Sequence, residues 1–276
     1  MGFFEKMRQI DRRWIFLAVG VAIILPFFFY IGLPIKVTPE VKVLYDSVER
    51  LKPGDVVFFA PEYDPGTIPE LQPMCHAFLR QCFSKGIKIV AVCLFQLGPA
   101  QAEQDLTLIA KEYNQKYGVD YVYLGYKPYP ETVILNMGED FRKSFPKDYY
   151  GNLVDTLPMM RNLKNYSDTK MIISINATSG ADYWIRSAHG RYNIPLGLGV
   201  TAVMATDYYT YLQSGQLFAL VGGMKGAAEM EQLVGLEGKK YNRATARMDI
   251  QNFAHLVIIF FVILGNVAYF ATWGKK

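Results

Sequence analysis

The sequence predicts an α/β fold: one Rossmann-like domain with a mostly parallel sheet, flanked by an N-terminal and a C-terminal transmembrane helix. Two observations lead to this prediction. Long uncharged segments lie close to both ends of the 276-residue chain. Between them, continuous apolar runs alternate with segments whose apolar residues recur at helical spacing. Such apolar runs are typical of parallel strands that are covered on both faces by helices.

The two terminal segments are each long enough to cross a bilayer. Residues 14–35 and 253–273 contain no Asp, Glu, Lys or Arg, and about 20 apolar residues suffice for a membrane helix. Aromatic residues, which favour the membrane interface, stand at or near the ends of both segments: Trp14, Tyr30, Tyr269 and Trp273. A cleaved signal peptide and a buried helix are the alternatives. No small-residue cleavage site follows the first segment, so both are interpreted as membrane spans.

The charge distribution predicts an orientation. The tails, residues 1–13 and 274–276, carry the whole formal net charge of +4, whereas acidic and basic residues cancel within 36–252. Positive flanks favour the cytoplasmic side, so both termini are predicted to be cytoplasmic and the central domain extracytoplasmic. Residues 239–252 are basic on the supposed outer side, which opposes this rule. They are interpreted as a juxtamembrane helix that contacts anionic lipid.

The extramembrane domain is predicted to span residues 36–238. Its first half alternates helices and strands. Helices are expected at 39–51, 71–82 and 100–117, and buried strands at 55–60, 87–95 and 119–125. This alternation predicts right-handed crossovers onto one parallel sheet.

The second half is less regular because prolines interrupt residues 126–170. A short strand is expected within 132–136, and order resumes with a buried strand at 170–177 and a helix at 180–189. A further strand is expected within 194–206. Residues 208–240 are predicted to form two helices, divided near Ser214 and Gly215.

Polar side chains follow four of the expected strands. In open parallel sheets, ligands bind beyond the carboxyl ends of the strands. The candidate binding residues at these ends are Glu62, Asp64, Gln96, Lys127, Asn176, Thr178 and Ser179, with Tyr126 beside Lys127. Each type has an ordinary alternative: a helix cap for Thr178 or Ser179, and turn formation for Glu62 and Asp64. Their convergence on one edge of the sheet predicts a ligand site, without identifying the ligand.

Two segments resemble a family of membrane enzymes. Residues 179–197, "SGADYWIRSAHGRYNIPLG", and the strand–turn–helix–strand unit of residues 58–95 are similar to membrane-bound relatives of the Clp and signal-peptide peptidases. The resemblance implies a serine hydrolase in which Ser179 is the nucleophile. Such a serine needs a base within hydrogen-bond reach, and the candidates are His189 and Lys127. His189 lies about 15 Å further along the same helix by helical rise, so a membrane-bound hydrolase is the alternative function and enzymatic activity stays open.

A helix with small residues suggests an assembly role. Residues 222–235, "GGMKGAAEMEQLVG", contain the interface candidates Gly222, Gly223, Gly226 and Ala227. Small residues at this spacing let another backbone approach closely, although they could equally pack on the domain's own sheet. The main functional prediction is therefore an oligomeric assembly component, or a ligand- or partner-binding component, at the membrane surface.

Other functional classes lack a sequence signal. The chain contains no P-loop, no dinucleotide-binding glycine motif and no metal-ligand spacing among its three cysteines and three histidines. We therefore predict no cofactor and no metal. Because the central domain is electrically neutral, nucleic acid is not a predicted partner. The expected partners are the lipid bilayer and either further copies of the chain or the other members of a membrane complex.

Overall fold

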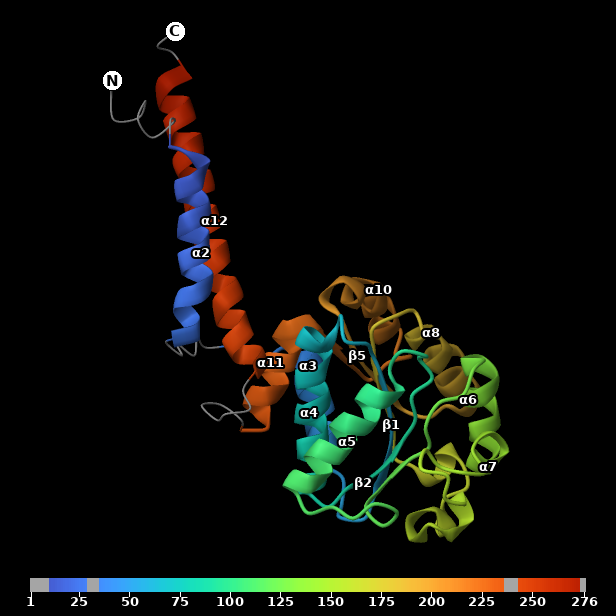
Figure 1. The fold of residues 1–276 in the computed structure, drawn as a ribbon. Coiled ribbons are helices and arrows are strands. Elements are labelled where there is room, and N and C mark those ends of the chain that lie inside the picture. Colours follow the sequence, from blue (N-terminus) through green and yellow to red (C-terminus); the bar gives the residue numbers. More distant parts are fainter. Residues whose placement is uncertain (1–9, 29–34, 236–242, 274–276) are drawn as a thin grey trace. The chain divides into compact units, whose positions relative to one another are not determined.

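The computed structural model describes residues 10–28, 35–235 and 243–273 (Figure 1). The chain divides into two compact units. Residues 35–244 form the α/β domain, and helical segments from the two chain ends form the other unit. Because the placement of the units relative to each other is not determined, each is described by itself.

The centre of the domain is a six-stranded sheet in which every neighbouring pair is parallel. Its strands are β1 (Val56–Glu62), β2 (Lys88–Ala91), β3 (Tyr121–Tyr123), β4 (Ile172–Asn176), β5 (Leu196–Val200) and β6 (Ala219–Gly222). Their order is β3-β2-β1-β4-β5-β6, which is the order of the doubly wound nucleotide-binding folds. The predicted α/β class with a parallel sheet is thereby confirmed.

Helices cover both faces of this sheet (Figure 1). One face carries α3 (Pro39–Glu49), α4 (Ile68–Ser84), α5 (Pro99–Glu112) and α11 (Gly223–Leu233). The other carries α6 (Pro130–Glu139), α7 (Phe141–Ser144), α10 (Ala202–Gln213), the 3-10 turns η1 (Val154–Thr156), η2 (Pro158–Asn162) and η3 (Tyr166–Asp168), and one helical run. That run consists of α8 (Ala181–Tyr183), the π-helical η4 (Trp184–His189) and α9 (Gly190–Tyr192).

The strand β1 shows why the sequence folds in two layers of helices around the sheet. All seven of its residues are buried, and successive side chains of a strand point to opposite faces. Phe58 packs among Phe141, Tyr166 and Trp184, with ring centroids between 5.3 and 5.8 Å apart. Phe59 packs on the other face against Phe78 of α4 at 5.1 Å. A continuous apolar run is therefore what both covering layers require.

Two predicted elements are wrong. Residues 132–136, expected as a short strand, lie inside α6, where Pro130 starts the helix and Val133, Ile134 and Met137 bury one face. Residues 208–240, expected as two helices, contain the edge strand β6 between α10 and α11. A four-residue apolar run such as that of β6 cannot be distinguished from a buried helical turn by its periodicity.

Of the terminal segments, one qualifies by length and composition as a membrane span. Residues 244–272 of α12 (Arg243–Thr272) have a mean hydropathy of 2.2 in their most apolar window. The N-terminal helix α2 (Arg12–Phe28) has 17 described residues, which at about 1.5 Å per residue is shorter than the roughly 30 Å apolar layer. Within the described residues no N-terminal span is found. The described part of the chain excludes residues 1–9, 29–34, 236–242 and 274–276. The predictions made for these residues therefore lie outside the described structure.

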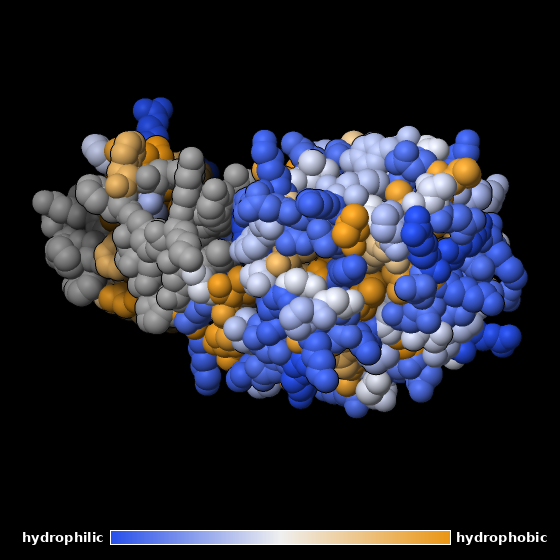
Figure 2. All heavy atoms as spheres, turned by 90° about the horizontal axis from the view of Figure 1, so that it is seen from below, coloured by the Kyte–Doolittle hydropathy of each residue, from blue (hydrophilic) through white to orange (hydrophobic). Residues whose placement is uncertain are grey.

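The surface of the α/β domain is mostly hydrophilic on the face shown in Figure 2, where apolar residues form small separate patches. The three cysteines, Cys75, Cys82 and Cys93, are free and buried. Burial raises the pKa of each thiol, which keeps them protonated and unreactive.

Candidate functional site

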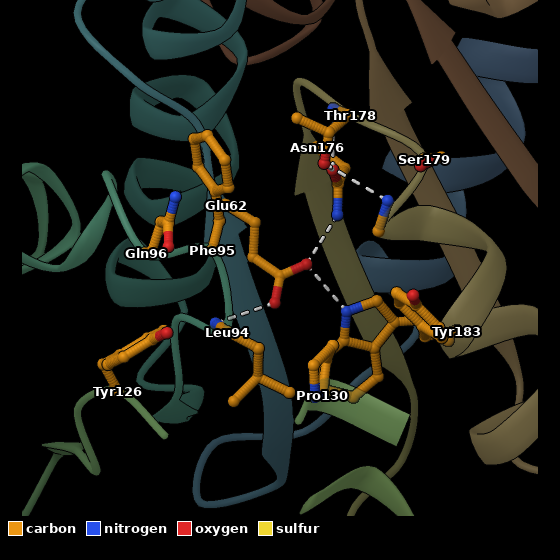
Figure 3. Close-up of a pocket in the computed structure, with 12 residues that line it drawn as sticks. Glu62, Leu94, Phe95, Gln96, Tyr126, Pro130, Asn176, Thr178, Ser179 and Tyr183 are labelled. Carbon is orange, nitrogen blue, oxygen red and sulfur yellow. Dashed lines mark hydrogen bonds between the residues drawn. The ribbon is translucent and has the colours of Figure 1, made fainter. Parts of the chain in front are cut away.

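A cavity of about 290 Å³ opens at the carboxyl edge of the sheet, between β1 and β4 (Figure 3). The chain leaves β1 toward β2 and β3 and later returns to the other side of β1 as β4, so the strand order reverses between these two strands. Crevices at such reversal points are where open α/β sheets bind ligands. The cavity is lined by Glu62, Leu94, Phe95, Gln96, Tyr126, Pro130, Asn176, Thr178, Ser179, Gly180, Tyr183 and Trp184.

Glu62, the last residue of β1, is the central polar group. Its carboxylate accepts three hydrogen bonds: from the Leu94 backbone N–H to Oε1 at 2.9 Å, and to Oε2 from Asn176 Nδ2 at 2.5 Å and Trp184 Nε1 at 2.8 Å. These bonds connect the ends of β1, β2 and β4 to the helical run that follows β4. Burial raises the pKa of Glu62 to about 7, although the Trp184 and Leu94 hydrogen bonds act in the opposite direction.

The turn after β4 fixes the orientation of the Asn176 amide. Its Oδ1 accepts hydrogen bonds from the backbone N–H of Thr178 at 2.9 Å and from the Thr178 hydroxyl at 3.1 Å, so its Nδ2 is left to donate to Glu62. A Cβ on Gly180 would lie 3.0 Å from that Nδ2, so a larger residue at this position would press on the amide. The small residues of the turn therefore let the chain pass closely over the amide.

Thr178 and Ser179 have different roles in this turn. The Thr178 hydroxyl accepts a hydrogen bond from the Gly180 N–H at 3.2 Å, so Thr178 satisfies part of the turn's backbone. Within the described structure, the Ser179 hydroxyl makes no hydrogen bond and its residue is exposed at the cavity. Capping of a backbone N–H by the side chain thus explains part of the role of Thr178, whereas Ser179 has no such role.

Aromatic side chains form the remaining walls. Phe95 follows β2, Tyr126 follows β3, and Tyr183 lies in the helical run after β4 (Figure 3). Trp184 is the next residue of that run. The π-helical segment begins at Trp184, and single π-turns often occur at functional sites because they redirect a side chain. Here the segment starts at the residue whose indole N–H bonds Glu62.

The structure brings together most of the predicted site residues. Glu62, Gln96, Asn176, Thr178 and Ser179 line the same cavity, and Tyr126 joins them. Two predicted residues do not line it. Asp64 accepts a hydrogen bond from the Thr67 N–H at 3.1 Å and closes the turn before α4, while Lys127 is exposed. That the cavity residues bind a ligand stays a prediction.

Sequence reasoning missed three of the aromatic lining residues, Phe95, Tyr183 and Trp184, and also Leu94. Trp184 and Tyr183 lie within an expected helix, where an aromatic residue ordinarily indicates the core. Leu94 contributes its backbone N–H, which no sequence pattern reveals. The one usable signal was the position of Phe95 beside Gln96 after an expected strand.

The proposed base for a serine nucleophile is absent from the cavity. His189 does not line it, and its Nδ1 lies 3.0 Å from the backbone oxygen of Ile194. Lys127 does not line it either. In the described structure Ser179 therefore has no adjacent imidazole or amine to activate it.

A second polar cluster stabilises the opposite face of β1. Asp105 of α5 is fully buried and accepts hydrogen bonds from the Tyr63 hydroxyl, from Gln72 Nε2 at 2.9 Å and from Gln101 Nε2 at 3.1 Å. His76 Nε2 lies 2.7 Å from the same carboxylate. Glu62 and Tyr63, adjacent in sequence at the end of β1, thus anchor the sheet edge to different layers.

The residues predicted to form an oligomer interface pack within the domain. Gly223, Gly226 and Ala227 are buried. A Cβ on Gly226 would lie 2.8 Å from Val221 Cγ1, and one on Gly222 would lie 2.9 Å from Ala205 Cβ. At Gly223 the backbone has φ +60° and an added Cβ would meet Ala202 at 2.6 Å. The small residues therefore allow α11 to approach β6 and α10 in the same chain.

Comparisons with known proteins add no assignment. No protein-family model, curated protein or solved structure matches the chain. Among the described residues, no group of His, Cys, Asp and Glu side chains is arranged to hold a metal ion.

Proposed function

We propose that the α/β domain is a small-molecule-binding module of a membrane-associated protein. The observation that carries this proposal is the cavity between β1 and β4, where side chains from three strand ends converge around the buried Glu62. A concave site with aromatic walls and a few oriented polar groups is the usual form of a ligand pocket.

The sheet order by itself does not indicate a dinucleotide. In dinucleotide-binding folds the turn after the first strand carries a glycine-rich motif that lets the pyrophosphate approach the backbone. Here the corresponding residues, 62–68, are "EYDPGTI". Fold and ligand are separable, so the ligand must be inferred from the cavity itself.

The membrane part of the proposal rests on α12. Its length and apolar composition fit a span. We propose in addition that residues 14–35 form a second span and that both termini are cytoplasmic, because the tails carry the net positive charge. Sequence composition alone supports these two additions.

A fragment screen tests the binding function. The full chain in a non-ionic detergent, with Trp14→Phe and Trp273→Phe, retains Trp184 as its sole tryptophan, so its fluorescence reports on the cavity. Mixed amine, amide, alcohol and acid fragments should include members that shift this emission saturably. Ser179→Phe, which fills the cavity mouth, should abolish the response, whereas Ser84→Phe at an exposed position at the end of α4 should not.

Two outcomes would contradict the proposal. One is a screen without any saturable response. The other is an equal response in Ser179→Phe and in the parent protein, which would place binding elsewhere.

A membrane-bound hydrolase is the second candidate. Its support is the Ser179 hydroxyl at the cavity, which has no hydrogen bond to any described residue. Its weakness is that no described His or Lys lines the cavity as a base. A fluorophosphonate probe, which labels activated serines, tests it directly. Labelling that disappears in Ser179→Ala would favour hydrolysis over simple binding.

The predicted homo-oligomer has no assigned surface. Since Gly226 and Ala227 are buried in their own domain, they are not proposed as contacts between copies. Self-association and a lipid bilayer partner stay predictions, and no nucleic-acid partner is proposed.

A further inference from the structure

The charge inside the cavity is unbalanced. Of its twelve lining residues, all in the described part of the chain, Glu62 is the one carboxylate, and none is Lys, Arg or His. The partners that hold Glu62 are a backbone amide, a side-chain amide and an indole, all of them neutral. A buried carboxylate without a cationic partner is costly, and a ligand that brings a positive charge offsets this cost.

Within the described part of the chain, the hydrogen bonds of Glu62 leave one acceptor position of its carboxylate open. An ionised carboxylate offers about four lone-pair sites. Oε2 accepts two hydrogen bonds and Oε1 accepts one, from Leu94. Because all three partners are donors, the fourth site, on Oε1, is suited to a further donor from the cavity.

The walls fit the same ligand chemistry. Phe95, Tyr126, Tyr183 and Trp184 contribute rings to the lining. Organic cations are attracted to the faces of aromatic rings, and sites that bind ammonium groups use several of them. The volume of about 290 Å³ is about twice that of an engineered cavity that binds benzene, so one ring with a short chain fits.

From the free acceptor position on Glu62 Oε1 and the surrounding aromatic walls, we propose that the cavity binds an organic ammonium ion that carries an apolar ring. The ammonium N–H donates to Glu62, and the ring lies among the aromatic side chains. This inference rests on the proposed binding function and names its ligand class.

The pH dependence of such binding follows from Glu62. Burial raises the pKa of this carboxyl to about 7, and only its ionised form attracts the cation. Affinity for an ammonium ion should therefore fall about tenfold per pH unit below pH 7. Other charged or titratable side chains line the cavity, stand within two residues of a lining residue or interact electrostatically with Glu62: Tyr63, Asp64, Cys93, Tyr123, Tyr126, Lys127, Tyr129, Glu131, Tyr166, Asp182, Tyr183 and Arg186.

Glu62 is the one carboxyl among the lining residues, and we therefore expect it to govern the pH dependence near pH 7. Asp64 is engaged with Thr67, and Asp182 accepts a hydrogen bond from the Tyr208 hydroxyl at 3.0 Å. Arg186 lies over the Tyr183 ring at 5.4 Å. Burial raises the pKa of Cys93, Tyr123 and Tyr166, so they stay neutral.

A series of three probes with one ring and different charges tests the proposal. The probes are 2-phenylethylamine, 2-phenylethanol and phenylacetate, titrated into the full chain in non-ionic detergent at about pH 8 and followed by Trp184 fluorescence and calorimetry. The amine should bind at least about tenfold more tightly than the alcohol, because both donate to the same ionised carboxylate and only the ammonium adds an attraction between opposite charges. Phenylacetate should bind most weakly. Glu62→Gln should reduce the preference for the amine to less than about threefold.

Two further measurements do not depend on that variant folding. In the parent protein, amine affinity should weaken below pH 7 while alcohol affinity stays constant. Tyr126→Ala, at an exposed rim position, should weaken the binding of the amine and of the alcohol alike, because both place their ring among the aromatic side chains.

The failures of the two proposals are distinguishable. If the alcohol or phenylacetate binds as tightly as the amine, the ligand class is wrong and the binding function stands. If none of the probes binds, the ligand class is overturned, and the fragment screen decides the binding function separately. An amine preference that survives in Glu62→Gln with no pH dependence would also overturn the inference.

Discussion

Replacing Glu62 with Gln should change how the free energy of unfolding depends on pH. Burial raises the pKa of this carboxyl from 4.5 to about 7 in the folded domain, so the folded state holds the proton more tightly than the unfolded chain does. The stability due to this proton is fully present below pH 4.5 and is lost as pH rises through about 7. Since a tenfold change in proton affinity corresponds to about 1.4 kcal/mol, the loss attributable to Glu62 is about 3 kcal/mol.

The measurement is urea unfolding of the full chain in non-ionic detergent from about pH 4.5 to about pH 8. With Trp14→Phe and Trp273→Phe, the emission of Trp184 follows unfolding of the α/β domain. All other titrating groups are common to the parent and Glu62→Gln, so the difference between their unfolding free energies isolates Glu62. That difference should change by about 3 kcal/mol across the range, with the parent losing stability relative to the variant as pH rises.

A constant offset between the two proteins is compatible with this reasoning. The amide nitrogen that Glu62→Gln introduces would face a donor, because all three neighbours of the carboxylate donate, and this lowers stability at every pH. Glu131→Gln, at an exposed position, controls for the substitution itself. Parallel pH curves for the parent and Glu62→Gln would refute the reasoning, since they would mean that the carboxyl has the same proton affinity folded and unfolded.

Three further predictions concern packing, the second polar cluster and topology. Gly226→Ala should lower stability by about 1–3 kcal/mol through overpacking against β6 and leave the sedimentation behaviour of the remaining folded protein unchanged; dispersal of an oligomer without loss of stability would contradict this. Tyr63→Phe should cost about 1.5–3 kcal/mol, because it removes a donor from the buried Asp105, and should leave probe binding at the cavity intact, as thermal melts and titrations can show. In intact cells, an impermeant thiol reagent should label the variant Lys147→Cys, at an exposed position, and not the variant Lys276→Cys. The native thiols are buried and should add little background. Labelling of Lys276→Cys alone would reverse the predicted orientation.

Part of the fold could be predicted because its signals are local. The run at 55–60 must be a strand covered on both faces, since it is apolar after its first residue and is bounded by Gly54 and Pro61. The carboxyl ends of parallel strands lie at one edge, and for this reason Glu62 and Asn176 were expected at the same edge of the sheet. The structure adds that they are register partners on adjacent strands. Composition also predicted the apolar C-terminal helix.

Other features depend on contacts between residues that are distant in sequence. β6 forms because β5 offers an unpaired edge, and nothing in the four residues of β6 distinguishes them from helix. Gly226 is small because Val221 lies against it, whereas its sequence context fitted a partner surface equally well. Until the sheet has formed, the same pattern of small residues fits packing inside the domain and packing against a second copy equally well.

The sequence by itself determined that polar residues follow the strands of a parallel sheet between apolar chain ends. Only the tertiary structure decided which of these residues share a cavity. It directs Asp64 into its own turn and brings Trp184, 122 positions away in sequence, to the carboxylate of Glu62. The physical reason is that local backbone preferences fix where strands and helices begin, whereas the direction and pairing of side chains are set by packing and hydrogen bonds that exist only after the chain has closed on itself.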